Sequence, residues 1–533
     1  MEYGLSETLT IYSGGLGVLA GDFLRSAHAL KLPLVGVGIA WAEGYTQQKI
    51  SPDGQPEDHA VPLDRTLLQR EKPVVHVKIA GEDVPLAIYR VDQLDNAPLY
   101  LLEPIEARDR WITRRLYGGD DDHRVAQEII LGIGGVRALE ALGIPVDFYH
   151  FNEGHAVFAG LELMRRARER GLSLEAARAE VREHIVFTTH TPVDAGNEKH
   201  ELERLRRMGA DAGFTLGELE RLGGRPFNMT VAGLRLSRRA NAVAELHGET
   251  ARQMWSHVED AAPITAITNG VDHRVWQDAR VCAADSDEAL ERAHAACKRE
   301  LLNEIAARAG VSFDPTRLVI GFARRATAYK RATLLFHEWP RAEALLADGK
   351  AQLVFAGKAH PRDAGGRALI AELVHLSHRF PGRVVFLPDY DLRLGRLLTR
   401  GCDVWMNTPR RPLEACGTSG MKAAMNGVLN LSILDGWWVE GCEHGVTGWR
   451  IGDERTYESE AEGDAADASA LHGLLDGEVV PLYYHDRPRW LHMMRASIEM
   501  AVTRFSSDRM VRDYYAKLYV RGASERARRA AAG

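Results

Sequence analysis

The sequence predicts an α/β protein of two doubly wound domains that face a cleft. Short apolar runs typical of buried strands alternate with helical patterns, first over residues 8–272 and again from Arg317 onward. Such alternation is typical of parallel sheets covered by helices on both faces. With 533 residues, the chain is also too long for a single hydrophobic core. We therefore predict an N-terminal domain over residues 1–280, a second domain over 281–500, and a C-terminal helix and tail over 501–533.

The composition is that of a globular protein without an excess of basic charge. Hydrophobic residues make up 45% and charged residues 26%, and the net charge of −7 argues against a general nucleic-acid or membrane-surface binder. The five cysteines form no CxxC pair, which fits a reducing cytosol and no structural zinc. Apolar runs stay near ten residues, and the N-terminus lacks the features of a signal peptide. These features predict a cytoplasmic protein with no membrane span and no metal site.

A glycine-rich turn opens the first series. Thr8–Tyr12 is prone to form a strand and enters the loop Ser13-Gly14-Gly15-Leu16-Gly17, after which apolar residues recur at helical spacing. A strand, a glycine turn and a helix together form a cradle of backbone N–H groups that can bind an anion. The loop is not a GxGxxG fingerprint, and no GxxxxGK[ST] motif occurs. The alternative is a tight turn required only for packing.

The next elements follow from similar patterns. Residues 32–42 predict a buried strand, residues 45–110 predict hairpins and loops, and residues 123–142 predict a long helix. We interpret the acidic loop 118–122 as a partner of the helix dipole rather than as a metal site. Glycines inside a helix each cost about 1 kcal/mol relative to Ala. Three of them therefore predict close packing against another backbone: Gly132, Gly134 and Gly135.

Two histidine-bearing turns follow strands of the first series. Residues 146–151 lead into Asn152-Glu153-Gly154-His155, and residues 185–189 lead into a turn with His190. The carboxyl ends of parallel strands meet at one edge of a sheet, where ligands bind, so we expect these turns to lie together. The spacing is not that of an HExxH zinc motif, and a histidine satisfied within the core is the alternative.

The second series carries a basic cluster. The strand predicted at 318–322 is followed by Arg324, Arg325, Lys330 and Arg331. An arginine fork and a lysine point charge together suit a phosphate dianion if the turn folds back. The alternative is a solvated basic helix face. Further strands are predicted at 352–356, 384–387 and 402–406.

The segment Glu414–Gly427 sets a single lysine, Lys422, after a run of small residues and before an apolar segment. Small residues admit a ligand close to the backbone, and a lysine there can pair with phosphate or form a Schiff base. A solvated capping lysine is the alternative. Ser419–Lys422 matches S-x-x-K, but the chain lacks S-D-N and K-T-G, so a β-lactamase-like hydrolase is not supported.

Several of these motifs together resemble the α-glucan (glycogen, maltodextrin or starch) phosphorylase family, and most closely its shorter bacterial branch. The resemblance implies a GT-B fold, in which two Rossmann-like domains face a cleft. It is carried by Ser13–Gly17, Asn152–His155, Thr189–Thr191, Thr268–Gly270, Arg324–Arg331, Gly357–Ala359 and Glu414–Gly427.

The resemblance also implies pyridoxal 5'-phosphate as the cofactor. Lys422 would bind it as a Schiff base, and its phosphate would contact Arg324, Tyr390 and Thr418. In this family the cofactor is not an electron sink, because its phosphate acts as a proton relay beside the substrate phosphate.

For the substrates, the resemblance implies inorganic phosphate and an α-1,4-glucan or maltodextrin. Arg325, Lys330 and a backbone N–H at Gly14 or Gly15 would hold the phosphate. The phosphate would protonate the glycosidic oxygen and then attack from the same face, releasing α-glucose 1-phosphate with retained configuration.

The sugar contacts are implied in the same way. Glu414 and the N–H groups after it, including that of Gly417, would bind the donor sugar, with His190 beside it. Glu153 and His155 would line the acceptor side. A homodimer is the candidate assembly.

The chain departs from the family pattern in several places. Cys416 stands where Ser is expected, Arg324 replaces a Lys of animal-type members, and Gly420 replaces their Asn. Met1–Gly4 begins inside a family motif, so a shortened N-terminus is expected. Two alternative functions therefore remain: a GT-B transferase that uses a nucleotide sugar, and an inactive glucan-binding fragment.

Overall fold

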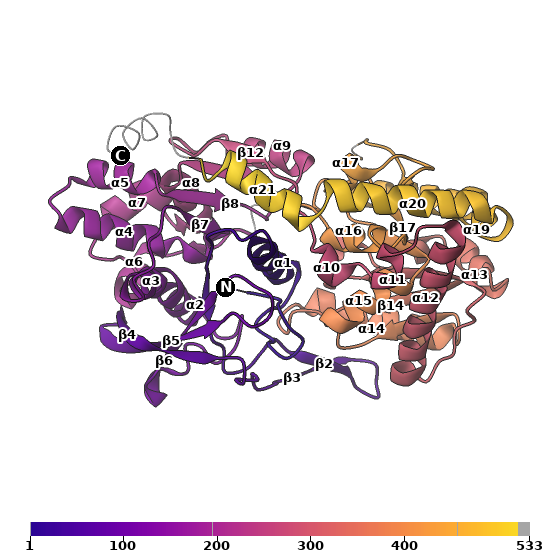
Figure 1. Ribbon diagram of the computed structural model, residues 1–533, viewed down its shortest axis with the longest axis horizontal. Coiled ribbons are helices and arrows are strands. Elements are labelled where there is room, and N and C mark those ends of the chain that lie inside the picture. Colours follow the sequence, from indigo (N-terminus) through magenta and orange to yellow (C-terminus); the bar gives the residue numbers. More distant parts are fainter. Residues whose placement is uncertain (1, 194–195, 456, 521–533) are drawn as a thin grey trace.

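The computed structural model describes residues 2–193, 196–455 and 457–520. The protein is a mixed α/β structure whose N-terminal and C-terminal halves carry separate sheets, as Figure 1 shows. In that view the N-terminal half, in indigo to magenta, lies beside the C-terminal half, in red to yellow. The predicted α/β class with parallel sheets is confirmed.

Two four-stranded sheets form the N-terminal half. One is wholly parallel, and its strand order is β12 (Ile264–Ala266), β11 (Arg239–Ala242), β8 (Ile185–Thr188), β7 (Tyr149–Asn152). The other pairs one parallel strand with an antiparallel meander, in the order β1 (Gly36–Ile39), β6 (Leu99–Pro104), β5 (Glu82–Val91), β4 (Gln69–Ile79). The meander accounts for the hairpins predicted over residues 45–110. A short hairpin joins β2 (Gln47–Ile50) to β3 (Pro56–His59), and a separate antiparallel pair is formed by β9 (Lys199–His200) and β10 (Phe227–Asn228), which lie far apart in the chain.

Helices pack on these sheets and enclose one large apolar core. They are α1 (Gly15–Ala29), α2 (Asp121–Ile129), α3 (Gly135–Ala141), α4 (Phe158–Glu169), α5 (Leu174–Arg182), α6 (Leu202–Met208), α7 (Leu216–Gly223), α8 (Met229–Leu236) and α9 (Glu245–Met254). A π-helical turn joins α2 to α3, so this pair corresponds to the single helix predicted over 123–142.

The C-terminal half is built on one six-stranded parallel sheet. Its strands are almost completely buried, because helices cover both faces and the sequence supplies continuous apolar runs. The order is β15 (Val384–Leu387), β14 (Ala351–Ala356), β13 (Leu318–Ala323), β16 (Val404–Asn407), β17 (Leu429–Ile433), β18 (Gly448–Ile451). The helices after residue 272 are α10 (His273–Trp276), α11 (Ala279–Cys282), α12 (Asp287–Ala309), α13 (Trp339–Ala347), α14 (Ala364–Arg379), α15 (Leu392–Gly401), α16 (Thr418–Ala424), α17 (Trp438–Gly441), α18 (Glu460–Leu474), α19 (Val480–His485), α20 (Arg487–Arg504) and α21 (Ser507–Lys517).

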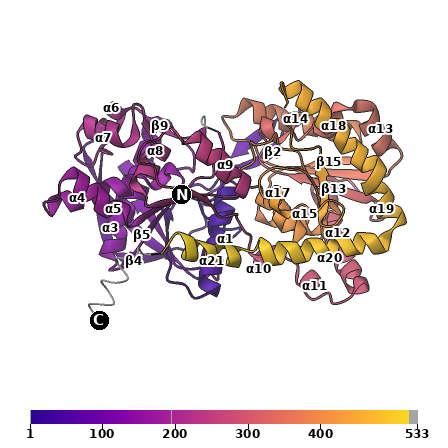
Figure 2. The same ribbon diagram turned by 90° about the horizontal axis from the view of Figure 1, so that it is seen from above.

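The last two helices return the chain to the N-terminal half. Figures 1 and 2 both show α20 along the C-terminal half and α21 continuing onto the other half. There α21 packs against α1, with Ser26 Oγ and Ser507 Oγ 2.6 Å apart. The helix predicted after residue 500 is therefore present, while the tail beyond residue 520 lies outside the described residues.

Several local predictions can now be compared with the structure. The predicted packing against another backbone is found at Gly132, where an added Cβ would lie 2.7 Å from Ala159 N. At Gly134 and Gly135 the close neighbours are side chains instead, with Leu86 Cδ1 at 2.9 Å and Val37 Cγ1 at 3.1 Å. Asp120 caps α2 by accepting from the His123 N–H, as the dipole interpretation of the acidic loop requires.

The strand predicted at Thr8–Tyr12 is wrong. This segment makes only isolated backbone contacts, such as Tyr3 N to Ile11 O, and its neighbours are irregular. In the described part of the chain, no helix is long and apolar enough to cross a membrane.

Candidate functional site

A cleft of about 1140 Å³ lies between the two halves. Its wall contains every site residue predicted from the sequence. The N-terminal half contributes Gly14, Gly15, Glu153, His155 and His190, and the C-terminal half contributes Arg324, Arg325, Lys330, Tyr390, Glu414, Gly417, Thr418 and Lys422. Residues 408 positions apart in the chain, counted from Gly14 to Lys422, thus share one cavity.

Lys422 projects from α16, the short helix that follows β16 and its loop. The residue is only 7% exposed, and its Nζ lies 3.7 Å from the centroid of the Trp276 ring. The pKa of Lys422 is lowered to about 8, because the effect of burial is larger than the opposing effect of the nearby Asp22 carboxylate. An amine with this pKa is neutral in an appreciable fraction of molecules near pH 7 to 8, which nucleophilic chemistry requires.

Trp276 and Asp22 complete the surroundings of that amine. The Trp276 Nε1–H donates to both oxygens of Asp22, at 2.9 and 3.2 Å. Sequence reasoning missed both residues. Two features of the sequence could have indicated them. Asp22 is an acid three residues after Leu19, on the apolar face of the predicted helix, and Trp276 follows shortly after the Thr268-Asn269-Gly270 turn.

The basic turn after β13 lines the same cleft and meets Glu414. Arg324 Nη2 lies 2.5 Å and Lys330 Nζ 3.2 Å from the same oxygen, Oε2 of Glu414. Burial alone would raise the pKa of Glu414, but Arg324 and Lys330 hold it below its usual value. The pKa of Lys330 falls to about 8, because burial and Arg324 outweigh the opposing effect of Glu414. Arg325 is exposed on the cleft wall.

Arg331 does not join this group, contrary to the predicted four-residue basic cluster. Its side chain is buried and pairs with Asp464 at 2.9 Å and Asp467 at 2.6 Å. It also donates to the backbone oxygens of Thr408 and Pro409. Arg331 has a left-handed backbone with φ of 47°, and this local change of chain direction separates its side chain from those of Arg324 and Lys330. Arg331 therefore braces the C-terminal half.

The glycine loop faces the cleft from the opposite half. A Cβ added at Gly14 or Gly15 would meet nothing within 4 Å, so the loop leaves open space for a ligand. The Gly14 N–H donates to Glu2 Oε2 at 3.3 Å, while Gly15 is the first residue of α1. Backbone N–H groups in a first helical turn have no partner within the helix. Gly15 is thus the better placed of the two predicted donors.

Glu153 holds the histidine turn. Its Oε1 accepts from the backbone N–H of His190 and, at 3.0 Å, from Thr191 Oγ1. This contact accompanies a left-handed backbone at Glu153, where φ is 66°. Burial lowers the pKa of His190 to about 3 and that of His155 to about 4, so both rings are neutral at pH 7. The two turns meet at the sheet edge, as predicted.

Comparison with known proteins identifies the family of this chain. A family model described as carbohydrate phosphorylase matches residues 277–447, a range that includes the basic turn and Lys422. The chain is 39% identical to the maltodextrin phosphorylase of Thermococcus litoralis, over 97% of this chain and 70% of that protein. It is 38% identical to the glycogen phosphorylase of Mycobacterium bovis, over 100% of this chain and 71% of that protein.

The chain belongs to the carbohydrate phosphorylase family. A third relative, the glycogen phosphorylase of Aquifex aeolicus, is 37% identical over 97% of this chain and 85% of that protein. These matches extend over both halves, so family membership does not rest on the region of Lys422 alone. The predicted resemblance to the α-glucan phosphorylases is confirmed.

A group with metal-ligand spacing includes two residues of the cleft wall, His155 and Glu198. Among the described residues, Glu128, His155 and Glu198 offer ligand atoms within 4.8 Å of one another. Arg124 already lies between them, with its Nε 2.6 Å from Glu198 and 3.4 Å from Glu128. A guanidinium therefore supplies the positive charge that a metal would bring.

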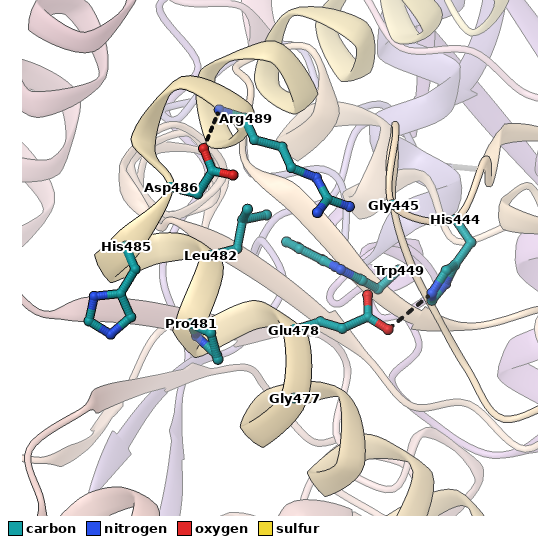
Figure 3. Close-up of a pocket in the computed structure, with 10 residues that line it drawn as sticks. All are labelled: His444, Gly445, Trp449, Gly477, Glu478, Pro481, Leu482, His485, Asp486 and Arg489. Atoms are coloured by element: carbon teal, nitrogen blue, oxygen red, sulfur yellow. Dashed lines mark hydrogen bonds and ion pairs between the residues drawn. The ribbon is translucent and has the colours of Figure 1, made fainter.

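A second cavity, of about 520 Å³, lies on the C-terminal half and is drawn in Figure 3. It is lined by α19, the adjoining turns and the loop at His444, and Glu478 pairs with His444 at 3.5 Å. It contains none of the predicted site residues. The chemistry-bearing residues of this phosphorylase therefore gather in the larger cleft.

Proposed function

We propose that this protein is an α-glucan phosphorylase, which transfers glucosyl units from an α-1,4-glucan or maltodextrin to inorganic phosphate. The observation that carries the proposal is the convergence of a buried amine with a depressed pKa, an arginine–lysine turn and an open glycine loop on one cleft. The product is α-glucose 1-phosphate with retained configuration. We assign the GT-B arrangement to the chain, with domains over residues 1–280 and 281–500 and a C-terminal helix and tail over 501–533.

The residues around Lys422 fit pyridoxal 5'-phosphate. The Lys422 amine is buried and readily neutral, as attachment to an aldehyde requires. Arg324 Nη1 is buried without a hydrogen-bond partner among the described residues, which leaves a donor for the cofactor phosphate. Thr418 and Tyr390 line the same wall. When bound, the cofactor supplies a phosphate group that exchanges a proton with the substrate phosphate.

The substrate phosphate binds between the two halves in this proposal. Arg325 provides a bidentate fork from the exposed side, Lys330 provides a point charge, and the Gly15 N–H provides a backbone donor. Crowded positive groups favour the dianion and hold it in a fixed orientation for attack on the sugar.

The glucan binds against groups that are neutral or already hydrogen-bonded. His190 offers an uncharged ring beside the donor sugar, while Glu414 and the N–H groups up to Gly417 bind sugar hydroxyls. Glu153 fixes the His190 turn, and His155 lines the acceptor side. Such a lining suits a polyhydroxylated chain, because the His190 ring is uncharged and the Glu414 charge is already paired, so the glucan meets no unpaired charge.

The test is phosphate-dependent release of glucose 1-phosphate from maltodextrin, measured with and without added pyridoxal 5'-phosphate. Release that requires both supports the proposal. Glucosyl transfer from a nucleotide sugar without bound pyridoxal would support the transferase alternative, and glucan binding without product would support the inactive fragment. Sedimentation velocity tests the homodimer, and the cytoplasmic location stays a prediction.

A further inference from the structure

Asp22 is a buried acid with no role in the function proposed above. It is 1% exposed on the inner face of α1, close to the mainly apolar cluster that contains Val18, Trp276 and Met421. A carboxylate in such a place is costly unless it is hydrogen-bonded or paired with a charge. Among the described residues, its hydrogen bonds come from one donor, the Trp276 Nε1–H.

The tryptophan ring connects this carboxylate to Lys422. Asp22 contacts the N–H edge of the indole, while the Lys422 Nζ lies 3.7 Å from the ring centroid. Aromatic rings carry a positive edge and a negative face, so an anion at the edge and a cation at the face are both favoured. One indole therefore stabilises both charges and holds them in a fixed relation.

The other charged groups near Asp22 come from its own helix and from the start of α10. Arg25 lies on α1 and Asp272 precedes α10, where Asp272 is itself paired with Arg274 at 2.8 Å. Of the described charged groups, Asp22 is the one that acts on the Lys422 amine. Burial raises the pKa of Asp22 to about 6, although Lys422 opposes this. With the amine near 8, both groups are charged between about pH 6 and pH 8.

We propose that Asp22 is a positioning residue for Lys422, because its carboxylate holds the Trp276 ring against the amine and supplies the charge that balances the buried lysine. The purpose of this arrangement rests on the proposed function, in which Lys422 carries the cofactor. The arrangement of Asp22, Trp276 and Lys422 involves only protein side chains, so it can be tested without an activity assay.

The test is a pH titration of the Lys422 amine in the full chain freed of pyridoxal. Lysines are reductively methylated with ¹³C-formaldehyde and followed by NMR, and the Lys422 signal is assigned by its loss in Lys422→Arg. Asp22→Asn keeps an oxygen that accepts from Trp276 and removes only the charge. Removing an opposite charge lowers a lysine pKa, so the midpoint should fall from near 8 by about one pH unit or more.

A matched control separates this effect from general disturbance of the fold. Asp278→Asn also alters a buried acid near Trp276, but Asp278 faces Arg280 at 2.8 Å. The Lys422 midpoint should not change in that variant. An unchanged midpoint in Asp22→Asn, or an equal shift in both variants, would overturn the proposal.

A second variant keeps the test decisive if Asp22→Asn does not fold. Trp276→Phe retains a ring but removes the N–H, so the Lys422 midpoint should again fall, by less than in Asp22→Asn. In the double variant the two shifts should be less than additive, because both act through one hydrogen bond. Additive shifts would contradict the role of the ring. The titrations do not depend on activity. If the protein released no glucose 1-phosphate, the proposed function would be wrong, but the positioning role of Asp22 could still be confirmed or refuted.

Discussion

Two lysines in one cleft, the partly buried Lys330 and the buried Lys422, differ in what surrounds them. Lys330 and Lys422 both have a pKa lowered to about 8, mainly by burial. Lys330 belongs to an ion network, with its Nζ 3.2 Å from Glu414 and Arg324 on the same carboxylate. The Lys422 Nζ instead lies 3.7 Å from the centroid of the Trp276 ring and is influenced by one carboxylate, whereas the Lys330 Nζ is 5.0 Å from the centroid of the Tyr329 ring.

The difference indicates a division of tasks. A lysine among fixed charges and hydrogen-bond acceptors is suited to bind an anion, because its neighbours hold it in place and a dianion can replace the carboxylate. A lysine against an aromatic ring makes few hydrogen bonds and can change its protonation state at little structural cost. Although the two lysines have similar pKa values, we expect Lys330 to bind phosphate and Lys422 to anchor the cofactor.

The largest expected effect separates the two lysines directly. Lys422→Ala should remove bound pyridoxal and lower phosphorolysis by at least about a thousandfold, or about 4 kcal/mol. Lys330→Ala should retain pyridoxal, since Lys330 has no role in attaching it, and should lose phosphate use. Pyridoxal absorbance and glucose 1-phosphate release measure the two effects. Full activity in Lys422→Ala would refute the assignment of this lysine.

The next effect concerns the exposed arginine of the basic turn. Arg325→Ala removes a bidentate partner of a desolvated dianion, which is worth about 2–5 kcal/mol. The KM for phosphate should rise by about thirtyfold or more, with little change in the free energy of unfolding because Arg325 is exposed. Arg331→Ala is the matched contrast, since loss of its buried pairs with Asp464 and Asp467 should lower stability instead. An unchanged phosphate dependence in Arg325→Ala would contradict the site.

Sequence patterns predicted the strands and the turns that follow them better than they predicted side-chain partners. Strand ends after β7, β8, β13 and β16 could be predicted because apolar runs and polar turns are local signals. The prediction for Arg331 was wrong because Arg331 itself has a left-handed backbone, which directs its side chain away from that of Lys330.

The surroundings of Lys422 were missed for a different reason. Asp22 and Trp276 are 254 positions apart, and their contact depends on tertiary packing between distant segments. No local pattern carries that information. The roles of the site residues also remain predictions, because their convergence on one cleft establishes proximity and the chemistry must still be measured.

A third variant tests the charge network by its pH dependence. Glu414→Gln removes the charge that raises the pKa of Lys330, so that pKa should fall further below 8. Since kcat/KM reports ionisations of the free enzyme, its alkaline limb with phosphate should move to lower pH by about one unit. The midpoint is diagnostic even if Glu414 also binds sugar and the overall rate falls. An alkaline limb that stays in place would show that Lys330 does not control phosphate binding.

The smallest expected effect lies at Gly417, where the two regions join. Its φ of 84° is left-handed, which costs a residue with a Cβ about 1–2 kcal/mol. Gly417→Ala should lower the free energy of unfolding by that amount in chemical denaturation. Gly473→Ala is the control, because its Cβ would meet nothing within 4 Å and a helical alanine should be neutral or stabilising.

Gly417→Ala also distinguishes the ion network around Lys330 from the surroundings of Lys422 by their effects on function. The new Cβ at position 417 would lie 3.3 Å from Glu414 Cγ and 3.5 Å from Arg324 Nη2, so the disturbance enters the ion network first. We expect the KM for phosphate to rise while the pyridoxal content matches that of the unaltered protein, because the Lys422 amine is held instead by its contact with the Trp276 ring, which Asp22 positions. Loss of pyridoxal at unchanged phosphate KM would mean that the loop, and not the indole and its carboxylate, positions the lysine.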